Sequence, residues 1–266
     1  MVSDVDVIIV AHNSGALLAE AVASAVAEAG EERVWVVDAE SVDGSVEAAT
    51  SRFPSVHVLP VPNRGFSASN NRGIEATSDA FVLLLNPDAV LERGAIAVLR
   101  AAMDAVPHAG IVGPAVRDAD GSVQAGSFGR FPSLLVRVGI AMRRVMRRFL
   151  SRPDVPRLPR QRRRVDWVTG ACMLVRRTSI DAVGVMDERF FLYYEDIEWC
   201  HRMRDHGWQV LLEPTATAVH HLGKSGGGPR SRQAYRESFE RYCDLYGLWG
   251  LRLASRLGLA LRRGER

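Results

Sequence analysis

The sequence has few cysteines and no long apolar run, and both shortages exclude classes of protein. Only 3 cysteines are spread over 266 residues, which excludes a disulfide scaffold and a cysteine zinc cluster and indicates a reducing compartment. No apolar run approaches the roughly 18–20 residues that cross a bilayer, and the acidic start of the chain differs from a basic signal peptide. Because 47% of the residues are apolar, the chain is also unlike a disordered protein. We therefore expect a globular, cytoplasmic protein.

The basic residues are almost all arginine, and many of them lie in one stretch. Lys224 is the single lysine among 34 basic side chains. Residues 137–164 contain eleven arginines and one acid, Asp154, which is typical of contact with phosphate groups in nucleic acid, lipid headgroups or a diphosphate. A solvated arginine-rich face is the simpler interpretation. The apolar spacing over 134–150 predicts an amphipathic helix, and the prolines and arginines of 151–164 indicate a loop or lid.

The first 116 residues alternate apolar strands with helical patterns. Near-continuous apolar runs predict strands buried on both faces at 5–11, 33–37, 56–60, 81–85 and 110–116. Helical spacing lies between them, at 17–29, 45–51, 67–76 and 95–106. This alternation predicts an α/β fold with a mostly parallel, doubly wound sheet, whose ligands bind beyond the carboxyl ends of the strands.

This regular alternation stops in the second part of the chain. A turn signal at 118–121 suggests a hairpin. Further on, the spacing predicts a helix at 195–206 and strands at 208–212 and 216–220, followed by a basic, helical tail from 225 to the end.

A candidate metal site follows the most apolar predicted strand, at Asn86, Pro87 and Asp88. A carboxylate at a strand end suits a divalent cation that takes its other ligands from water and a diphosphate. Asn-Pro-Asp is equally a good turn for structural reasons alone. His220 and His221 end the last predicted strand and point to opposite faces, so at most one enters a given site, and a lone histidine there is more often structural.

Two further carboxylate positions are candidates for chemistry. Glu195 and Asp196 follow an aromatic run at 190–194 and suit the start of a helix, where the macrodipole favours acids. Alternatively, the aromatic run forms a pocket wall and one carboxylate is a general base for a sugar hydroxyl. Asp38, after another predicted strand, is either a turn residue or the acceptor of a hydrogen bond from a nucleobase or ribose.

In combination and in this order, the motifs resemble the inverting family 2 glycosyltransferases of the GT-A fold, and within them the bacterial rhamnosyltransferase-like branch. The resemblance covers roughly residues 5–224, and it depends on the stretches 7–14, 36–38, 41–45, 63–73, 83–88, 170–176, 187–196 and 219–221. It implies one transferase domain over 1–224, divided into a nucleotide-sugar-binding half at 1–116 and an acceptor-facing half at 117–224. The basic tail at 225–266 follows this domain.

The resemblance also implies a role for each matching residue. Asp196 would be the catalytic base, and Glu195 would touch the acceptor or donor sugar. Asp88 would coordinate Mn²⁺ or Mg²⁺ together with His220, which fits the family's histidine better than His221. The chain departs from the family pattern at Ala39, where Asn is common. The residues that would hold the nucleotide-sugar donor are Ala11, His12, Asn13, Asp38, Arg64, Asn70, Asn71, Asp88 and Asn86, the last of which replaces the first Asp of the family's Asp-x-Asp motif.

The implied reaction is a metal-dependent, inverting sugar transfer, best assigned as L-rhamnose from dTDP-rhamnose. The acceptor would be a saccharide or a polyprenyl-diphosphate-linked saccharide in cell-wall or surface-polysaccharide synthesis. We expect the helix at 134–150 to lie on an anionic membrane surface at the inner face of the cell membrane. Contact with the acceptor or the membrane is expected at Tyr193, Tyr194, Trp167, Arg143, Arg144 and Arg147.

Other functions explain less of the sequence. An NAD-dependent oxidoreductase or a sugar nucleotidylyltransferase needs a glycine-rich loop after the first strand, where this chain has only Gly15. Nucleic-acid binding would explain the arginines, but it would leave Asp88, Asp196 and His220 without a role. The alternatives that stay open are a non-catalytic nucleotide-sugar-binding or membrane-associated partner subunit, and a transferase that uses a UDP-sugar.

Overall fold

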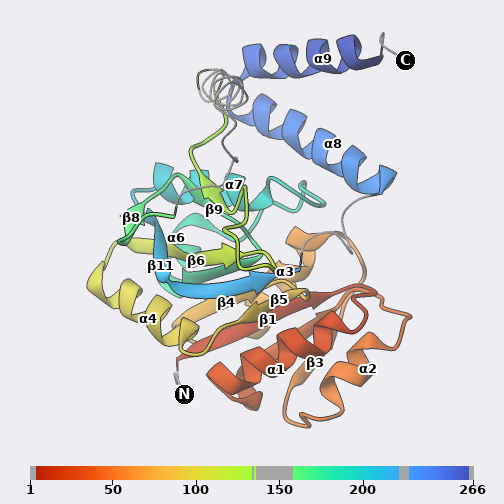
Figure 1. Ribbon diagram of the computed structural model, residues 1–266, viewed down its shortest axis with the longest axis vertical. Helices are drawn as coiled ribbons and strands as arrows, with labels where there is room; N and C mark the ends of the chain where they lie inside the picture. Colours follow the sequence, from red (N-terminus) through yellow and green to blue (C-terminus); the bar gives the residue numbers. More distant parts are fainter. Residues whose placement is uncertain (1–3, 134, 136–157, 222–227, 264–266) are drawn as a thin grey trace.

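The structure, a computed structural model, describes residues 4–133, 135, 158–221 and 228–263 (Figure 1). The predicted amphipathic helix at 134–150 therefore lies almost entirely outside the described residues. The strands are β1 (Val5–Ala11), β2 (Val34–Asp38), β3 (His57–Pro60), β4 (Phe81–Leu85), β5 (Ala89–Leu91), β6 (Ala109–Arg117), β7 (Phe128–Gly129), β8 (Arg163–Arg164), β9 (Trp167–Val168), β10 (Cys172–Arg176) and β11 (Gln209–His220). The helices are α1 (Leu17–Ala29), α2 (Ser45–Thr50), α3 (Phe66–Ala76), α4 (Ala95–Ala105), α6 (Arg177–Val183), α7 (Glu195–Asp205), α8 (Pro229–Leu245) and α9 (Trp249–Arg263).

One mixed sheet forms the centre of the molecule, in the order β3-β2-β1-β4-β10-β6-β11-β5 with β8 beside β11. The first four strands in this order run parallel, as the alternation of strands and helices predicts. β10 lies antiparallel between β4 and β6, which places its first residue, Cys172, beside Leu85 at the carboxyl end of β4. The chain after β4 and the chain before β10 therefore meet at one edge of the sheet.

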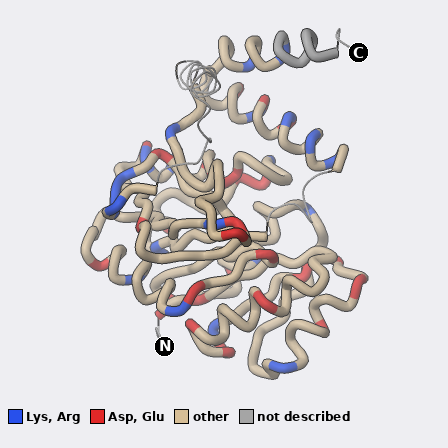
Figure 2. The backbone as a smooth tube through the Cα atoms, in the orientation of Figure 1, with Lys and Arg blue, Asp and Glu red and all other residues tan. Residues whose placement is uncertain are grey.

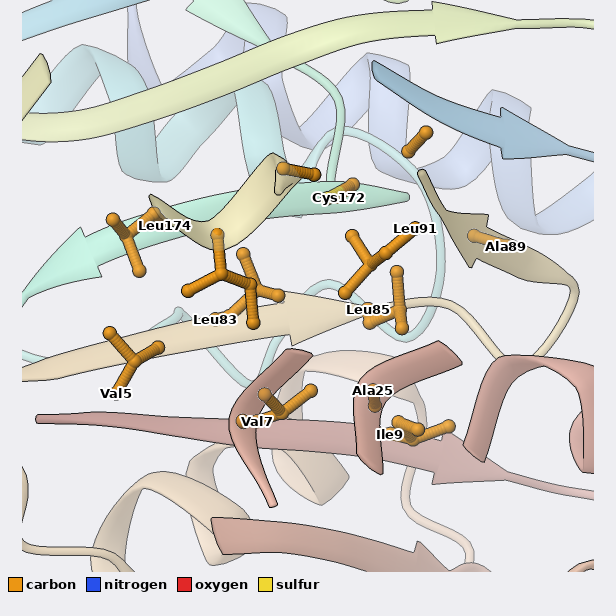
Figure 3. Packing of buried hydrophobic residues seen from close by; sticks show 14 of the residues in the cluster. Val5, Val7, Ile9, Ala25, Leu83, Leu85, Ala89, Leu91, Cys172 and Leu174 are labelled. Carbon is orange, nitrogen blue, oxygen red and sulfur yellow. The ribbon is translucent and has the colours of Figure 1, made fainter. Parts of the chain in front are cut away.

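Helices cover both faces of this sheet, and the side chains of each strand alternate between the two layers. In β1, Val7 and Ile9 pack with α1, α2 and α4, whereas Ile8 and Val10 pack with α3, α6 and α7. Figure 3 shows the first of these layers, where Val7 and Ile9 lie close to Ala25 of α1. Burial on both faces is what the continuous apolar runs predict.

The predicted elements agree with the observed ones where the pattern is long. β1, α1 and β4 occupy the predicted residues 5–11, 17–29 and 81–85. The strands predicted at 208–212 and 216–220 are one strand, β11, with an irregularity between Glu213 and Thr217. The patterns do not predict the three-residue strand β5, because it is too short to show a period.

The tail forms two helices, α8 and α9, that lie at one end of the molecule (Figure 1). α8 packs against the segment before α7 through an aromatic cluster that includes Phe190, Tyr194, Phe239 and Tyr242. Among the described residues, no helix has both the length and the apolar character needed to span a membrane.

Candidate active site

The loops after β1 and β2 are joined into one unit at the edge where the parallel strands end. His12 donates from Nδ1 to the carbonyl of Ala39 over 2.6 Å, and the side-chain oxygen of Asn13 accepts from the amide of Val42 over 2.9 Å. Asn13 has a φ of 51°, which asparagine tolerates better than most residues. Asp38 is half-buried at the end of β2 and accepts from the amide of Ser41 over 2.9 Å. Backbone hydrogen bonding also joins Ala11 to Ala39, so the residues predicted to surround the nucleotide form a fixed rim.

A second loop brings Arg64 to the same region. Gly65 has a φ of 104°, and a Cβ at this position would lie 2.6 Å from the carbonyl oxygen of Phe191. The amide of Phe66 donates to that oxygen over 2.7 Å, and the hydroxyl of Ser67 donates to the carbonyl of Phe190 over 2.7 Å. The start of α3 therefore lies against the segment that leads into α7, and exposed Arg64 lies at the junction.

Asn70 and Asn71, which are predicted to lie near the donor, are buried on α3. Asn71 is fully buried, and its amide both donates to the carbonyl of Met186 over 2.9 Å and accepts from the amide of Met186 over 3.0 Å. Asn70 is also buried and donates to the carbonyl of Phe66 in its own helix. The Asn71 amide is thus bonded inside the protein through both its nitrogen and its oxygen, whereas the bond given for Asn70 uses its nitrogen. Asn71 holds the chain that leads into α7.

The residues that are predicted to bind a metal lie together because strands β5 and β11 pair, which the sequence patterns do not predict. β5 pairs antiparallel with β11, and the register places Ala89 opposite His220. As a result, Nε2 of His220 lies 3.0 Å from Oδ1 of Asp88 and 3.3 Å from Nδ2 of Asn86. Asp88 and His220 are both buried.

This group of residues fits a divalent cation. Oδ1 of Asn86 is buried and has no hydrogen-bond partner among the described residues, so the turn holds an oxygen that is left unsatisfied. A carboxylate, an imidazole nitrogen and an amide oxygen are all suitable ligands for Mn²⁺, and a carboxylate is suitable for Mg²⁺. The described residues contain no group of three or more His, Cys, Asp and Glu side chains able to hold a metal. The remaining ligands would therefore come from water and a substrate diphosphate, as is usual for Mg²⁺.

Asp196 lies at the start of α7, and two backbone amides fix its carboxylate. Gly170 donates to Oδ2 over 2.9 Å, and Ile197 donates to Oδ1 over 2.7 Å. Burial raises the pKa of Asp196, while these hydrogen bonds oppose the increase. The side chain is half-buried, so it can still reach a bound molecule. A carboxylate fixed in this way at a partly open position suits removal of a proton from a bound molecule.

The neighbouring Glu195 is almost fully buried. Its Oε2 has no hydrogen-bond partner among the described residues. Burial, and then the nearby charge of Asp196, raise the pKa of Glu195 well above its ordinary value. The two adjacent carboxyls therefore have different environments, and Asp196 is the more accessible of the two.

Two of the aromatic residues before α7, Tyr193 and Tyr194, contact the tail. Tyr193 and Tyr194 have φ values of 69° and 66°, which turn the chain sharply into the helix. Tyr194 is buried and its hydroxyl lies 3.2 Å from that of Tyr235, while the hydroxyl of Tyr193 lies 2.7 Å from Oγ of Ser231. Both tyrosines are thus joined to α8, and contact of either with the acceptor or the membrane stays a prediction.

Two further groups were predicted to contact the acceptor or the membrane. Trp167 is half-buried and donates from Nε1 to the carbonyl of Arg130 over 3.0 Å, which closes the two-stranded sheet of β7 and β9. Arg143, Arg144 and Arg147 lie outside the described residues. The sequence also did not single out Gly170 or Gln124 as individual site residues. Gly170 lies in a motif stretch, whereas Gln124 carries no sequence signal.

Comparison with known proteins identifies the family of the chain. A family model described as "Glycosyltransferase like family 2" matches residues 3–242. The chain therefore belongs to glycosyltransferase family 2, and the resemblance stated from the motifs is confirmed. An N-acetylglucosaminyl-diphospho-decaprenol L-rhamnosyltransferase of Mycobacterium tuberculosis is 35% identical over 253 residues, a match that covers 86% of this chain and 81% of the relative.

Solved structures confirm the expected GT-A fold. A mannosyltransferase from Pyrobaculum calidifontis, in complex with GDP-Man and Mn²⁺, matches with a TM-score of 0.63 at 16% identity, covering 92% of this chain and 65% of the other. GalNAc-T7 with UDP, GalNAc and Mn²⁺ matches with a TM-score of 0.62 at 16% identity, covering 88% of this chain and 47% of the other.

Proposed function

We propose that this glycosyltransferase is metal-dependent and inverting, and that it transfers L-rhamnose from dTDP-rhamnose to a polyprenyl-diphosphate-linked saccharide in cell-wall or surface-polysaccharide synthesis. One observation supports this proposal most directly. The carbonyl of Ala171 accepts from the amide of Asn86 over 2.9 Å, and the adjacent Gly170 amide donates to Asp196 over 2.9 Å. A two-residue segment thus joins the candidate metal turn to the candidate base. The choice of sugar and acceptor is supported by the mycobacterial relative.

The chain's own residues account for the steps of such a transfer. Asp196 would accept the proton of the acceptor hydroxyl as its oxygen attacks the anomeric carbon, and the attack from the face opposite the diphosphate inverts the configuration. Asp88 and His220, with Asn86 beside them, would hold Mn²⁺ or Mg²⁺, which when bound stabilises negative charge on the leaving diphosphate. Asp38 and the rim at His12 and Asn13 would hold the nucleoside.

The proposed base is tested by Asp196→Asn in the purified protein. We expect the rate of rhamnosyl transfer from dTDP-rhamnose to a short polyprenyl-diphospho-GlcNAc to fall about 10²–10⁴-fold. Binding of the donor nucleotide, measured as the thermal shift that dTDP and Mn²⁺ cause, should stay close to that of the wild type. Asp181→Asn, an exposed change on α6, is the matched control and should leave the rate unchanged. Full activity of Asp196→Asn would contradict the assignment.

Thermal shifts measured with dTDP, UDP and GDP, each with and without Mn²⁺, separate the alternatives. A ligand that binds only the folded state raises stability by about 2.7 kcal/mol at a hundredfold excess over Kd. A Mn²⁺-dependent shift with dTDP but not with UDP or GDP would support the rhamnose donor, and a shift with UDP would favour a UDP-sugar. Binding without transfer, in the wild type with several acceptors, would favour the non-catalytic partner subunit.

A lipid-linked acceptor also requires contact with a membrane surface, and we propose that α9 makes it. Residues 229–263 carry eight arginines and three acids, and Figure 2 shows basic positions along α8. On α9, Trp249 and Leu253 are 77% and 60% exposed and lie one helical turn apart. An exposed apolar strip on a basic helix pair suits an anionic lipid surface. Contact through the arginines at 134–150 stays a prediction.

Vesicle sedimentation tests the membrane contact. We expect the wild type to bind vesicles that contain anionic lipid at low salt and to detach as salt rises. The pair Trp249→Glu and Leu253→Glu should abolish binding, whereas Val58→Glu, on the distant edge strand β3, should not. Equal binding by all three proteins would contradict a role for α9.

A further inference from the structure

A buried glutamine hydrogen-bonds to the candidate metal histidine, through the ring nitrogen that does not face Asp88. Gln124 is 4% exposed and follows the turn after β6. Its Oε1 lies 2.9 Å from Nδ1 of His220, and its Nε2 lies 3.3 Å from the carbonyl oxygen of the same histidine. Nε2 also donates to Oδ1 of Asp118 over 2.8 Å. One side-chain amide thus bonds to both the ring and the backbone of His220.

The hydrogen-bond chemistry of this contact allows only one orientation of the amide. The Asp118 carboxylate and the His220 carbonyl are both acceptors, so the NH₂ group of Gln124 must face them. Its oxygen is then the group that faces the ring, and Nδ1 of His220 must carry a hydrogen to donate to it. In the neutral ring, Nε2 consequently holds a lone pair. That lone pair lies 3.0 Å from Oδ1 of Asp88, where a cation can be shared by the two atoms.

The surrounding turn holds Gln124 and Asp118 in place. The backbone amide of Gln124 donates to the carbonyl of Val116 over 2.9 Å, and its carbonyl accepts from Oγ of Ser127 over 2.9 Å. The backbone amide of Asp118 donates to the carbonyl of Ser122 over 2.9 Å. The orientation of the glutamine is therefore built into the backbone of the 116–127 segment.

We propose that Gln124, oriented by Asp118, is a positioning residue that holds His220 in the Nδ1–H tautomer and presents Nε2, together with Asp88, to the divalent cation. This inference depends on the metal site of the proposed function. When a group that hydrogen-bonds to a metal ligand and orients it is removed, metal affinity or activity commonly falls 10–100-fold. The pair Asp118 and Gln124 would have that role here.

Mn²⁺ binding, measured by electron paramagnetic resonance titration of the purified protein, tests the proposal without the reaction. We expect Gln124→Leu to weaken Mn²⁺ binding by about 10–100-fold. Asp118→Ala keeps the glutamine but removes one of the two acceptors of its NH₂ group, so it should weaken binding by a smaller factor. Gln233→Leu, an exposed glutamine on α8, is the matched control and should bind as the wild type does. If the wild type itself binds no Mn²⁺, the proposed metal site fails; if Gln124→Leu binds as the wild type does, the positioning role fails.

The tautomer of His220 gives a readout that a general loss of stability does not change. Long-range ¹H–¹⁵N spectra of the metal-free protein, assigned with His220→Gln, should show Nδ1 protonated in the wild type. In Gln124→Leu and Asp118→Ala, the signal should move toward the Nε2–H form or an average of the two. A wild-type ring with its hydrogen on Nε2 would overturn the proposal, as would an unchanged Nδ1–H signal in both variants.

Discussion

The two sides of the candidate site are built in different ways. On the donor side, residues at the ends of β1 and β2 bond mainly to one another, as in the contact from His12 to Ala39. On the base side, the segment 186–194 follows no strand of the sheet and depends on distant parts of the chain. Asn71 holds its start, and α8 holds its end through the aromatic cluster with Tyr194.

This difference has a physical consequence for the base. Asp196 is placed by a regular helix, but that helix begins after two residues with positive φ, which cost free energy that surrounding contacts must offset. We therefore expect substitutions at the contacts of 186–194 to destabilise the protein more than comparable substitutions at neighbouring positions. The following predictions compare such pairs.

The largest effect is expected for Asn71→Ala. The change leaves the buried amide and carbonyl of Met186 without their partner, and each unsatisfied buried group costs about 1–3 kcal/mol. We expect the free energy of unfolding in urea to fall by about 3 kcal/mol. Asn70→Ala is the matched control, because among the described residues the Asn70 side chain bonds within its own helix, and it should cost about 1 kcal/mol or less. Equal losses would show that 186–194 does not depend on Asn71.

The next effect is expected for Gly65→Ala. A side chain there requires a positive φ and meets the backbone of Phe191, so we expect a loss of about 2–3 kcal/mol in unfolding free energy. Gly207→Ala has a similar φ of 83° in open space, so it should cost only the backbone strain, about 1 kcal/mol. The difference between the two variants, measured by chemical denaturation, isolates the contact of α3 with Phe191. Equal losses in the two variants would mean that the backbone at Phe191 can move away from position 65 without a cost in stability.

The same contrast explains what the sequence could predict. The parallel strands and α1 were predictable, because their apolar runs and helical spacing are continuous over whole elements. The turn at Asn86 and Asp88 was predictable as a motif, but its distance to His220 depends on the register of β5 with β11, which leaves no periodic signal in three residues. The direction of the Tyr193 and Tyr194 side chains could not be predicted, because it depends on left-handed backbone and on α8, about forty residues further along the chain.

The buried Glu195 makes the base side sensitive to pH. Because burial raises its pKa in the folded protein, the folded state holds a proton that the unfolded chain releases above pH of about 4. The free energy of unfolding should therefore fall as pH rises from about 4 toward the raised pKa. Glu195→Gln should make this decline shallower and raise stability at neutral pH, as measured by thermal unfolding at several pH values. Glu47→Gln, exposed on α2, should leave the slope unchanged; an unchanged slope in Glu195→Gln would contradict the account.

The smallest effect is expected where the base side meets the tail. Tyr194→Phe removes the hydroxyl that lies 3.2 Å from the hydroxyl of Tyr235 and keeps the ring in the aromatic cluster. A single hydrogen bond of this kind contributes about 0.5–1.5 kcal/mol, and Tyr235→Phe removes the same bond from the other side. The double variant should therefore cost about as much as either single variant, when the three are compared by chemical denaturation. Strictly additive losses would show that the two hydroxyls act separately and do not join the tail to 186–194.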